Sequence, residues 1–221
     1  MDYRKLEYFS SKPRLNRFLA ACGNSKSSAQ NLYRTNLRVS QAFYPVLNLF
    51  EIFLRNTLNY RMSIHFADPD WIIHQKNIFM NNISLARTKY FLKSSVVKAE
   101  NAILRKGGVV SSGKIIAEQT PGFWTSLFDV PHYRLIVETV IHAFPGKPPH
   151  INRSLLSQRL NRIREFRNRI YHNEPVCFTG TTVDFSRARI IRLEMFELLS
   201  WMDADLLDYV MAFDEIIAKI S

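Results

Sequence analysis

Apolar residues recur at helical spacing along most of the chain, in long segments with few turn residues. The chain has only 7 Gly and 9 Pro among 221 residues, so breaks between segments are few. Spacings of three and four predict amphipathic helices. The expected helices are residues 13–22, 29–66, 83–105, two shorter ones in FWTSLF and HYRLIVETVIHAF, then 151–172 and 186–218. Strands are nearly absent from this pattern, which predicts an all-α bundle.

A polar break near the start of the chain suggests two parts. Gly23 ends the first helical segment, and the run NSKSS follows it. Ser27 or Ser28 is the expected cap of the next helix, because serine hydroxyls accept hydrogen bonds from the first backbone N–H groups. We therefore expect an N-terminal helical extension over residues 1–28 and a main helical domain over residues 29–221.

Three further features interrupt the helical pattern. Pro45 is expected to bend the long helix, and the turn residues of ADPDW end it, so that Trp71 folds back onto the bundle. Residues 106–122 hold four of the seven glycines and are expected to form a mobile loop. The run GVVSSGK within them has the spacing of a phosphate-binding P-loop. Ile115 follows its lysine where the motif needs a hydroxyl, so the loop interpretation is favoured.

The charge is strongly positive but unevenly placed. The net charge is +11, which favours a polyanionic partner such as RNA, DNA or an anionic membrane surface. Residues 151–172 carry six arginines against one acid, whereas residues 193–221 carry seven acids against one lysine. The C-terminal segment is therefore able to neutralise part of the basic helix.

The same composition also limits which cellular compartment and which cofactors are expected. Cys22 and Cys177 are far apart and form no metal-ligand pair, which favours a reduced, cytoplasmic protein. The charged N-terminus MDYRKLEYFS is not a signal peptide, and no apolar run is long enough for a membrane span. The histidines lack i, i+4 partners and nearby cysteines, so neither a metal site nor a cofactor is expected.

The segment RIREFRNRIYHNEP is the strongest candidate for a site. Leu156, Leu160, Ile163 and Ile170 are spaced four, three and seven apart, and Arg167 stands where this rhythm calls for one more core residue. A guanidinium placed there costs free energy unless a carboxylate, a phosphate or a water-filled cleft receives it. The position therefore predicts a partner for Arg167.

A histidine stands near the expected end of the same helix. Asn173 and Pro175 stop the helix directly after His172, and Asn168 lies four residues before that histidine on the same face. Histidine suits proton transfer near neutral pH, and an arginine fork suits a phosphate. Together they are able to cleave a phosphodiester without a metal. The structural alternative is an arginine held by a buried acid and a histidine that merely caps its helix.

A second polar group lies in LNLFEIFLRNTLNY. Glu51 and Arg55 have the spacing and order of an intrahelical ion pair, and Asn56 follows directly. The apolar residues around them suggest partial burial. Two interpretations stay open: a structural salt bridge, or a Glu51 that orients Arg167 or His172 from a neighbouring helix.

The run RNRIYH resembles the Arg-polar-x-x-x-His signature of the HEPN ribonucleases. The ordered series LFEIFLRNTLNYRM, DPDW, GFWTSLF and LNRIREFRNRIYHNEPV resembles the Abi-like family of bacterial phage-resistance proteins, over about residues 49–176. The resemblance implies a HEPN-like bundle of four main helices with additional short ones, the Arg–His helix being the third. It also implies a metal-independent endoribonuclease that acts as a homodimer in phage defence or a toxin–antitoxin system.

The resemblance assigns roles residue by residue. Arg167 would bind the scissile phosphate, His172 would act as general acid or base, and Asn168 would orient one of them. RNA is the expected substrate, because DNA lacks the attacking 2′-hydroxyl. Glu51, Arg55, Asn56 and Tyr171 are expected to support this site, and the predicted RNA contacts are Arg162, Arg164 and Arg169.

One position departs from the family pattern. Some HEPN toxins carry a tyrosine two residues after the histidine, where an antitoxin modifies them, and this chain has Glu174 there. An RNA or a different protein is therefore the expected antitoxin. Two rivals remain: a non-catalytic RNA-binding or regulatory protein on the HEPN scaffold, and a protein-interaction module whose basic helix is consumed by the acidic C-terminal segment.

Overall fold

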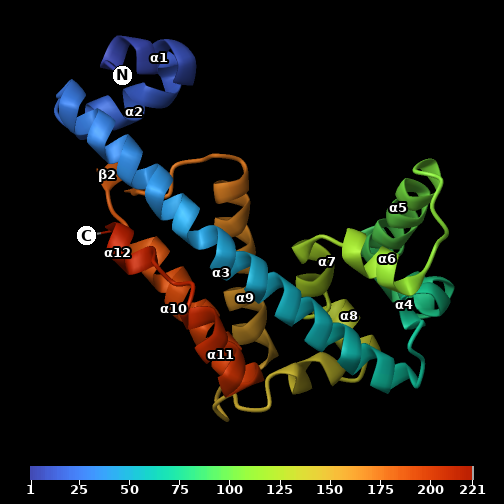
Figure 1. Cartoon of the computed structure of the whole chain (residues 1–221). Coiled ribbons are helices and arrows are strands. Elements are labelled where there is room, and N and C mark those ends of the chain that lie inside the picture. The colour runs from blue at the N-terminus through green and yellow to red at the C-terminus, as the bar shows by residue number, and fades with distance from the viewer. Residues whose placement is uncertain (221) are drawn as a thin grey trace.

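A computed structural model describes residues 1–220 of the chain, and they form an almost entirely helical structure (Figure 1). The predicted all-α class is confirmed, since the two strands of the described chain have only two residues each. The α-helices are α1 (Tyr3–Ser10), α2 (Lys12–Ala21), α3 (Lys26–Phe66), α4 (Trp71–His74), α5 (Phe91–Arg105), α6 (Ser112–Glu118), α7 (Pro121–Ser126), α8 (Val130–Leu135), α9 (Arg153–Tyr171), α10 (Ser186–Met202), α11 (Ala204–Met211) and α12 (Ile216–Ile220). The 3-10 helices are η1 (Gln75–Asn77), η2 (Phe79–Asn81), η3 (Ile83–Thr88) and η4 (Thr139–Ala143), and the strands are β1 (Phe178–Thr179) and β2 (Thr182–Val183). Ser221, the last residue of the predicted main domain, lies outside the described residues.

The long helix α3 runs diagonally through the whole molecule (Figure 1). Ser25 caps it, one turn earlier than predicted, because its hydroxyl accepts a hydrogen bond from the backbone N–H of Ser28. The helix continues through Pro45, whose exposed position lets the ring face solvent. Ala67 ends α3 in the left-handed conformation. Trp71 folds back as predicted, fully buried, and its indole Nε1 donates to Asn59 Oδ1 (2.9 Å).

Helix α9 and the C-terminal helices pack along α3 and form the main core with it (Figure 1). The predicted single helix over residues 186–218 is divided into α10, α11 and α12. Aspartates cause both breaks: Asp203 is extended and accepts from the backbone N–H of Asp205 (2.8 Å), and Asp214 accepts from that of Ile216 (3.2 Å). Side-chain acceptors of this kind start new helices.

The lobe formed by α4 to α6 lies to one side of the C-terminal half of α3 (Figure 1). The expected helix over residues 83–105 starts as η3 and breaks at Lys89 and Tyr90, which are both left-handed. The predicted mobile loop over residues 106–122 contains α6 instead. Ile115 is fully buried there because it belongs to the main core, and burial of an apolar side chain stabilises an ordered turn of helix.

A second, smaller hydrophobic cluster occupies the N-terminal end of α3. It consists of Tyr3, Leu15, Phe18, Ala29, Cys177 and Phe178. The segment before α10 thus packs onto the N-terminal helices, and Arg17 stacks over the Phe178 ring at 4.4 Å and donates to the backbone oxygen of Gly180 (2.7 Å). Residues 1–28 therefore share their core with a hairpin from the other end of the sequence. Across residues 1–220, no helix is both long enough and apolar enough to cross a membrane.

The two cysteines are expected to react differently with thiol reagents. Cys177 is fully buried, and burial raises the pKa of its thiol to about 12, so the reactive thiolate is scarce at pH 8. Cys22 is half-buried. We expect one thiol to be alkylated in the folded protein and a second only in denaturant, as mass spectrometry of the labelled peptides would show. Rapid labelling of Cys177 under native conditions would contradict the packing of this cluster.

Candidate functional site

The C-terminal end of α9 is capped by its own backbone, through a left-handed residue that follows the helix. Asn173 is left-handed (φ 56°), its N–H donates to Ile170 O (3.0 Å), and the N–H of Glu174 donates to Arg169 O (2.8 Å). His172 is the cap residue and its side chain is exposed. Arg14 of α2 donates to the carbonyl of Asn173 (2.9 Å), so the N-terminal helices hold this helix end from outside. The predicted position of His172 at the helix end is confirmed.

The predicted position of Arg167 on the apolar seam is wrong. Phe166 fills the missing core position: it is fully buried and packs against Phe43 with ring centroids 4.8 Å apart. Residue 166 is three after Ile163 and four before Ile170, so it satisfies the helical rhythm as well as residue 167 does. Arg167 lies beside the seam, and its side chain is 23% exposed.

Arg167 has the partner that its position required. Its Nε donates to Glu51 Oε1 of α3 (2.8 Å), in an ion pair whose two side chains are 23% and 25% exposed. The guanidinium also stacks over the Tyr171 ring (3.8 Å to the centroid), and Nη1 donates to Asn168 Oδ1 (3.4 Å). A carboxylate on one edge and a ring on one face fix the plane of the guanidinium.

The predicted Glu51–Arg55 ion pair is absent from residues 1–220. Glu51 pairs with Arg167 across the two helices, and Arg55 donates through Nε to Asn56 Oδ1 (3.4 Å). The contact fits both interpretations of Glu51: a structural salt bridge that links two helices, and a carboxylate that orients Arg167 from a neighbouring helix.

Tyr171 connects the arginine to its surroundings. Its ring lies 5.2 Å from that of Tyr44 on α3. Burial raises the pKa of the Tyr171 phenol, the Glu51 carboxylate raises it further, and Arg167 opposes them. At neutral pH the phenol is therefore protonated, so it is able to donate a hydrogen bond but not to act as a base.

A cavity of about 310 Å³ adjoins this group. Its polar lining comes from three elements that the fold brings together: Asn48, Glu51 and Arg55 of α3, Gln119 and Trp124 around α7, and Tyr171 of α9. The indole Nε1 of Trp124 is buried and has no hydrogen-bond partner within the described chain. Sequence reasoning singled out Glu51, Arg55 and Tyr171 but missed Asn48, Gln119 and Trp124. Only the run GFWTSLF gave a signal for the tryptophan.

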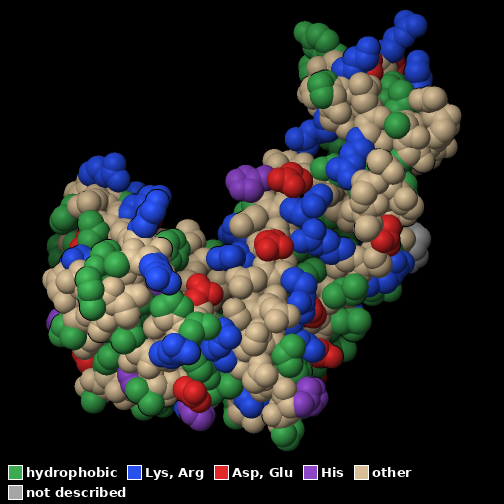
Figure 2. Space-filling model, turned by 180° about the vertical axis from the view of Figure 1, so that it is seen from behind, with side chains coloured by type: hydrophobic (Ala, Val, Ile, Leu, Met, Phe, Trp, Pro, Cys, Tyr) green, Lys and Arg blue, Asp and Glu red, His purple; other side chains and the backbone are tan. Residues whose placement is uncertain are grey.

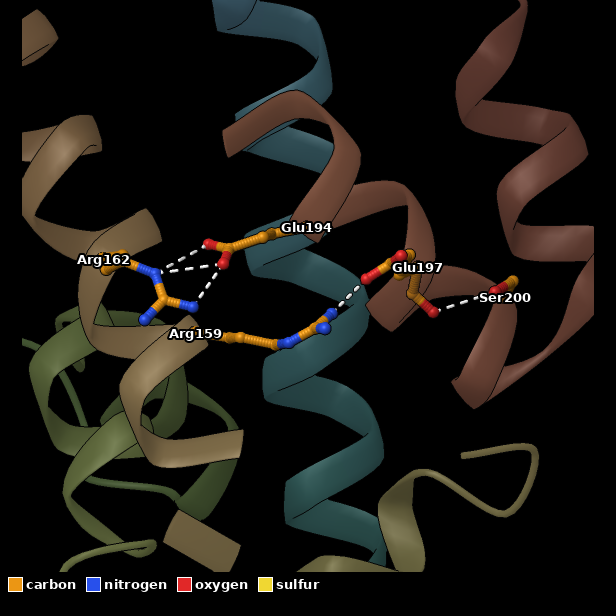
Figure 3. A network of polar contacts seen from close by, with 5 residues as sticks. All are labelled: Arg159, Arg162, Glu194, Glu197 and Ser200. Atoms are coloured by element: carbon orange, nitrogen blue, oxygen red, sulfur yellow. Dashed lines mark hydrogen bonds and ion pairs between the residues drawn. The ribbon is translucent and has the colours of Figure 1, made fainter. Parts of the chain in front are cut away.

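Two arginines of α9 pair with glutamates of α10 (Figure 3). Arg162 points toward Glu194 and donates to it through Nε (3.0 and 3.2 Å) and Nη2, which raises the pKa of the guanidinium. Arg159 binds Glu197 one turn away, and Ser200 donates to the Glu197 backbone oxygen (2.8 Å). The expectation that the C-terminal segment partly neutralises the basic helix is therefore confirmed.

The other two predicted RNA contacts also have intramolecular neighbours. Arg169 donates through Nη2 to Pro175 O (2.8 Å) and lies 3.7 Å from Glu174. Arg164 is half-buried near the start of α7, where a Cβ on Gly122 would lie 3.3 Å from its Nη1. Arg162, Arg164 and Arg169 thus help to hold α9 in place, which leaves them less available for phosphates.

Within residues 1–220, no three His, Cys, Asp or Glu side chains lie close enough together to hold a metal ion. His132 is the most buried histidine: Nδ1 lies 2.8 Å from Ser126 O, and burial lowers the pKa of its imidazole. It lies on α8, away from the end of α9.

Searches against family models, curated proteins and solved structures return no match for this chain.

Proposed function

We propose that this protein is a metal-independent endoribonuclease of the HEPN type, with Arg167, Asn168 and His172 as its catalytic residues. The observation that carries the proposal is the oriented guanidinium of Arg167, one turn before an exposed histidine at a helix end. An arginine fixed on one edge and one face keeps its other N–H groups for a phosphate. An exposed imidazole is reachable by a large substrate.

The reaction is an attack of the RNA 2′-oxygen on the adjacent phosphorus. The new O2′–P bond forms as the P–O5′ bond breaks, which leaves a 2′,3′-cyclic phosphate and a 5′-hydroxyl. A base takes the proton from the 2′-hydroxyl, and an acid gives a proton to the departing 5′-oxygen. Arg167 stabilises the charge on the phosphoryl oxygens, and Asn168 orients the phosphate or the histidine.

The need for both a base and an acid favours a homodimer. One chain offers a single histidine at this site, and a second copy would supply another His172 for the other proton transfer. Glu51 and Tyr171 act as positioning residues, because they contact Arg167. A role in phage defence or a toxin–antitoxin system, with an RNA or protein antitoxin, completes the proposal and rests on the resemblance of the sequence series around these residues.

A cleavage assay in EDTA tests the proposal. We expect purified protein to cut end-labelled RNA into fragments with 2′,3′-cyclic phosphate ends and to leave the matching DNA intact. Binding that weakens with salt but gives no product would favour the non-catalytic RNA-binding alternative. No salt-dependent binding at all would favour the protein-interaction module. Solution mass measurement checks the homodimer in the same preparation.

A further inference from the structure

Helix α5 and the turn before it carry a basic groove far from α9 in the sequence. The groove has a volume of about 620 Å³, and no aspartate or glutamate lines it. Four of its lining residues are cations: Lys89, Lys93, Lys98 and Arg105. We refer to these four residues and Tyr90 as the α5 groove.

The cations of the α5 groove have no carboxylate partner within the described chain. Lys93 donates to Asn81 Oδ1 (3.1 Å), and Arg105 donates to the backbone oxygen of Asn101 (3.2 Å). Cations nearby behave differently, since Lys76 pairs with Glu100 (2.7 Å) and Lys106 with Glu118 (3.1 Å). Two glutamates of α10 likewise pair with arginines of α9. The α5 groove therefore presents four cations without a carboxylate partner among residues 1–220.

Shared lining residues link the α5 groove to the cavity at the candidate site. A second hollow of about 540 Å³ shares Ser94 and Lys98 with the groove. The same hollow shares Gln119 with the cavity that Glu51 and Tyr171 line. Figure 2 shows the molecule notched between the lobe that carries α5 and α6 and the rest of the chain, with Lys and Arg side chains along the lobe's edge. The three hollows are therefore neighbours, and we refer to them together as the path.

Aromatic rings accompany the path. Tyr90 lines the α5 groove, Phe91 (39% exposed) lines the second hollow, and Tyr171 (38% exposed) lines the cavity. The acids along it have their own partners, because Glu118 is held by Lys106 and Glu51 by Arg167. Cations that track a backbone and rings that stack on unpaired bases are the two features of a single-strand binding surface. Stacked base pairs would keep their faces from these rings.

We propose that single-stranded RNA binds along this path, with its phosphates on the cations of the α5 groove and its bases leading past Phe91 to the cavity beside Tyr171. This deepens the proposed function and rests on it for the choice of RNA and for cleavage at the end of the path. It also moves the main RNA-binding charge from α9 to α5.

The test compares two triple variants in a His172→Ala background, so that the RNA stays intact. One is Lys89→Gln, Lys93→Gln and Lys98→Gln. The other, the matched control, removes the same charge from exposed positions of the N-terminal helices. Its changes are Arg4→Gln, Lys5→Gln and Lys12→Gln. The measurement is fluorescence anisotropy of a labelled, unstructured RNA over a range of salt concentrations.

We expect the groove variant to bind about tenfold more weakly than the control at moderate salt. Each lost phosphate contact lowers the slope of log affinity against log salt by about 0.7 for a single strand, so the slope should fall by about two. Circular dichroism melting checks that both variants are folded. Equal affinity and slope in the two variants would overturn the path, as would duplex DNA that competes as well as the RNA.

Failure of the proposed function would look different. Wild-type protein would then leave RNA uncut, whereas the groove variant would still lose binding relative to its control. Cleavage by wild-type protein together with equal binding by both variants would reject the path alone.

Discussion

Replacing His172 with alanine is expected to lower the rate of RNA cleavage by about 10²–10⁴-fold, the range over which a positioned acid or base acts. The imidazole is exposed, and within residues 1–220 it makes no hydrogen bond or ion pair. Only the backbone N–H of His172 bonds, to Asn168 O (2.9 Å), and alanine keeps that bond. The free energy of unfolding should therefore change by no more than about 0.5 kcal/mol, as thermal unfolding would show.

The matched control for this variant is His150→Ala. His150 is also exposed but lies in the loop before α9, at the opposite end of that helix. We expect His150→Ala to cut labelled RNA at the wild-type rate. A folded His172→Ala protein that cuts equally fast would remove the histidine from the mechanism.

Replacing Phe166 with alanine should cost about 3–5 kcal/mol of unfolding free energy, because it leaves a cavity in the main core. The side chain is fully buried and packs against Phe43. The measurement is urea unfolding followed by circular dichroism. The adjacent Glu165→Ala is the control: it removes only a 3.5 Å surface ion pair with Arg187 and should cost less than about 1 kcal/mol. A loss below about 1 kcal/mol for Phe166→Ala would contradict the packing of α9 on α3.

Phe166 also shows that helical periodicity alone does not identify every core residue. Residues 166 and 167 both fit between Ile163 and Ile170, one at spacings of three and four, the other at four and three. Hydrophobicity alone favours the phenylalanine, whereas a catalytic role at this position favours the arginine. The choice depends on the rotation of α9 against α3, which only the packed structure fixes.

Elements with strong local signals were predictable, and those decided by tertiary contact were not. The long helix, the return of Trp71 and the helix stop at His172 follow from nearby residues. The partner of Glu51 does not, because Arg55 is four residues away and Arg167 is 116 away, and packing selects the distant one.

Net charge likewise cannot tell free cations from paired ones. The arginines of residues 151–172 are dense in sequence, which predicts an RNA-binding surface on α9. In the structure Arg159 and Arg162 pair with glutamates of α10, while Lys89, Lys93 and Lys98 have no carboxylate partner within the described chain. Neutralisation is decided by neighbours in space, which a count along the chain does not contain.

Helix α3 is one continuous helix that connects the N-terminal hydrophobic cluster to the candidate site. Its 41 residues span about 60 Å, and the two hydrophobic clusters sit at fixed angular positions along it. One residue inserted between Leu32 and Val39 would turn the N-terminal helices by about 100° relative to α9. Arg14 would then point away from Asn173, and the hairpin around Phe178 would lose its packing against the N-terminal helices. The number of residues in this part of α3 is therefore under tighter constraint than the identity of its exposed residues. Insertions and deletions there should be tolerated only when they add or remove nearly whole helical turns.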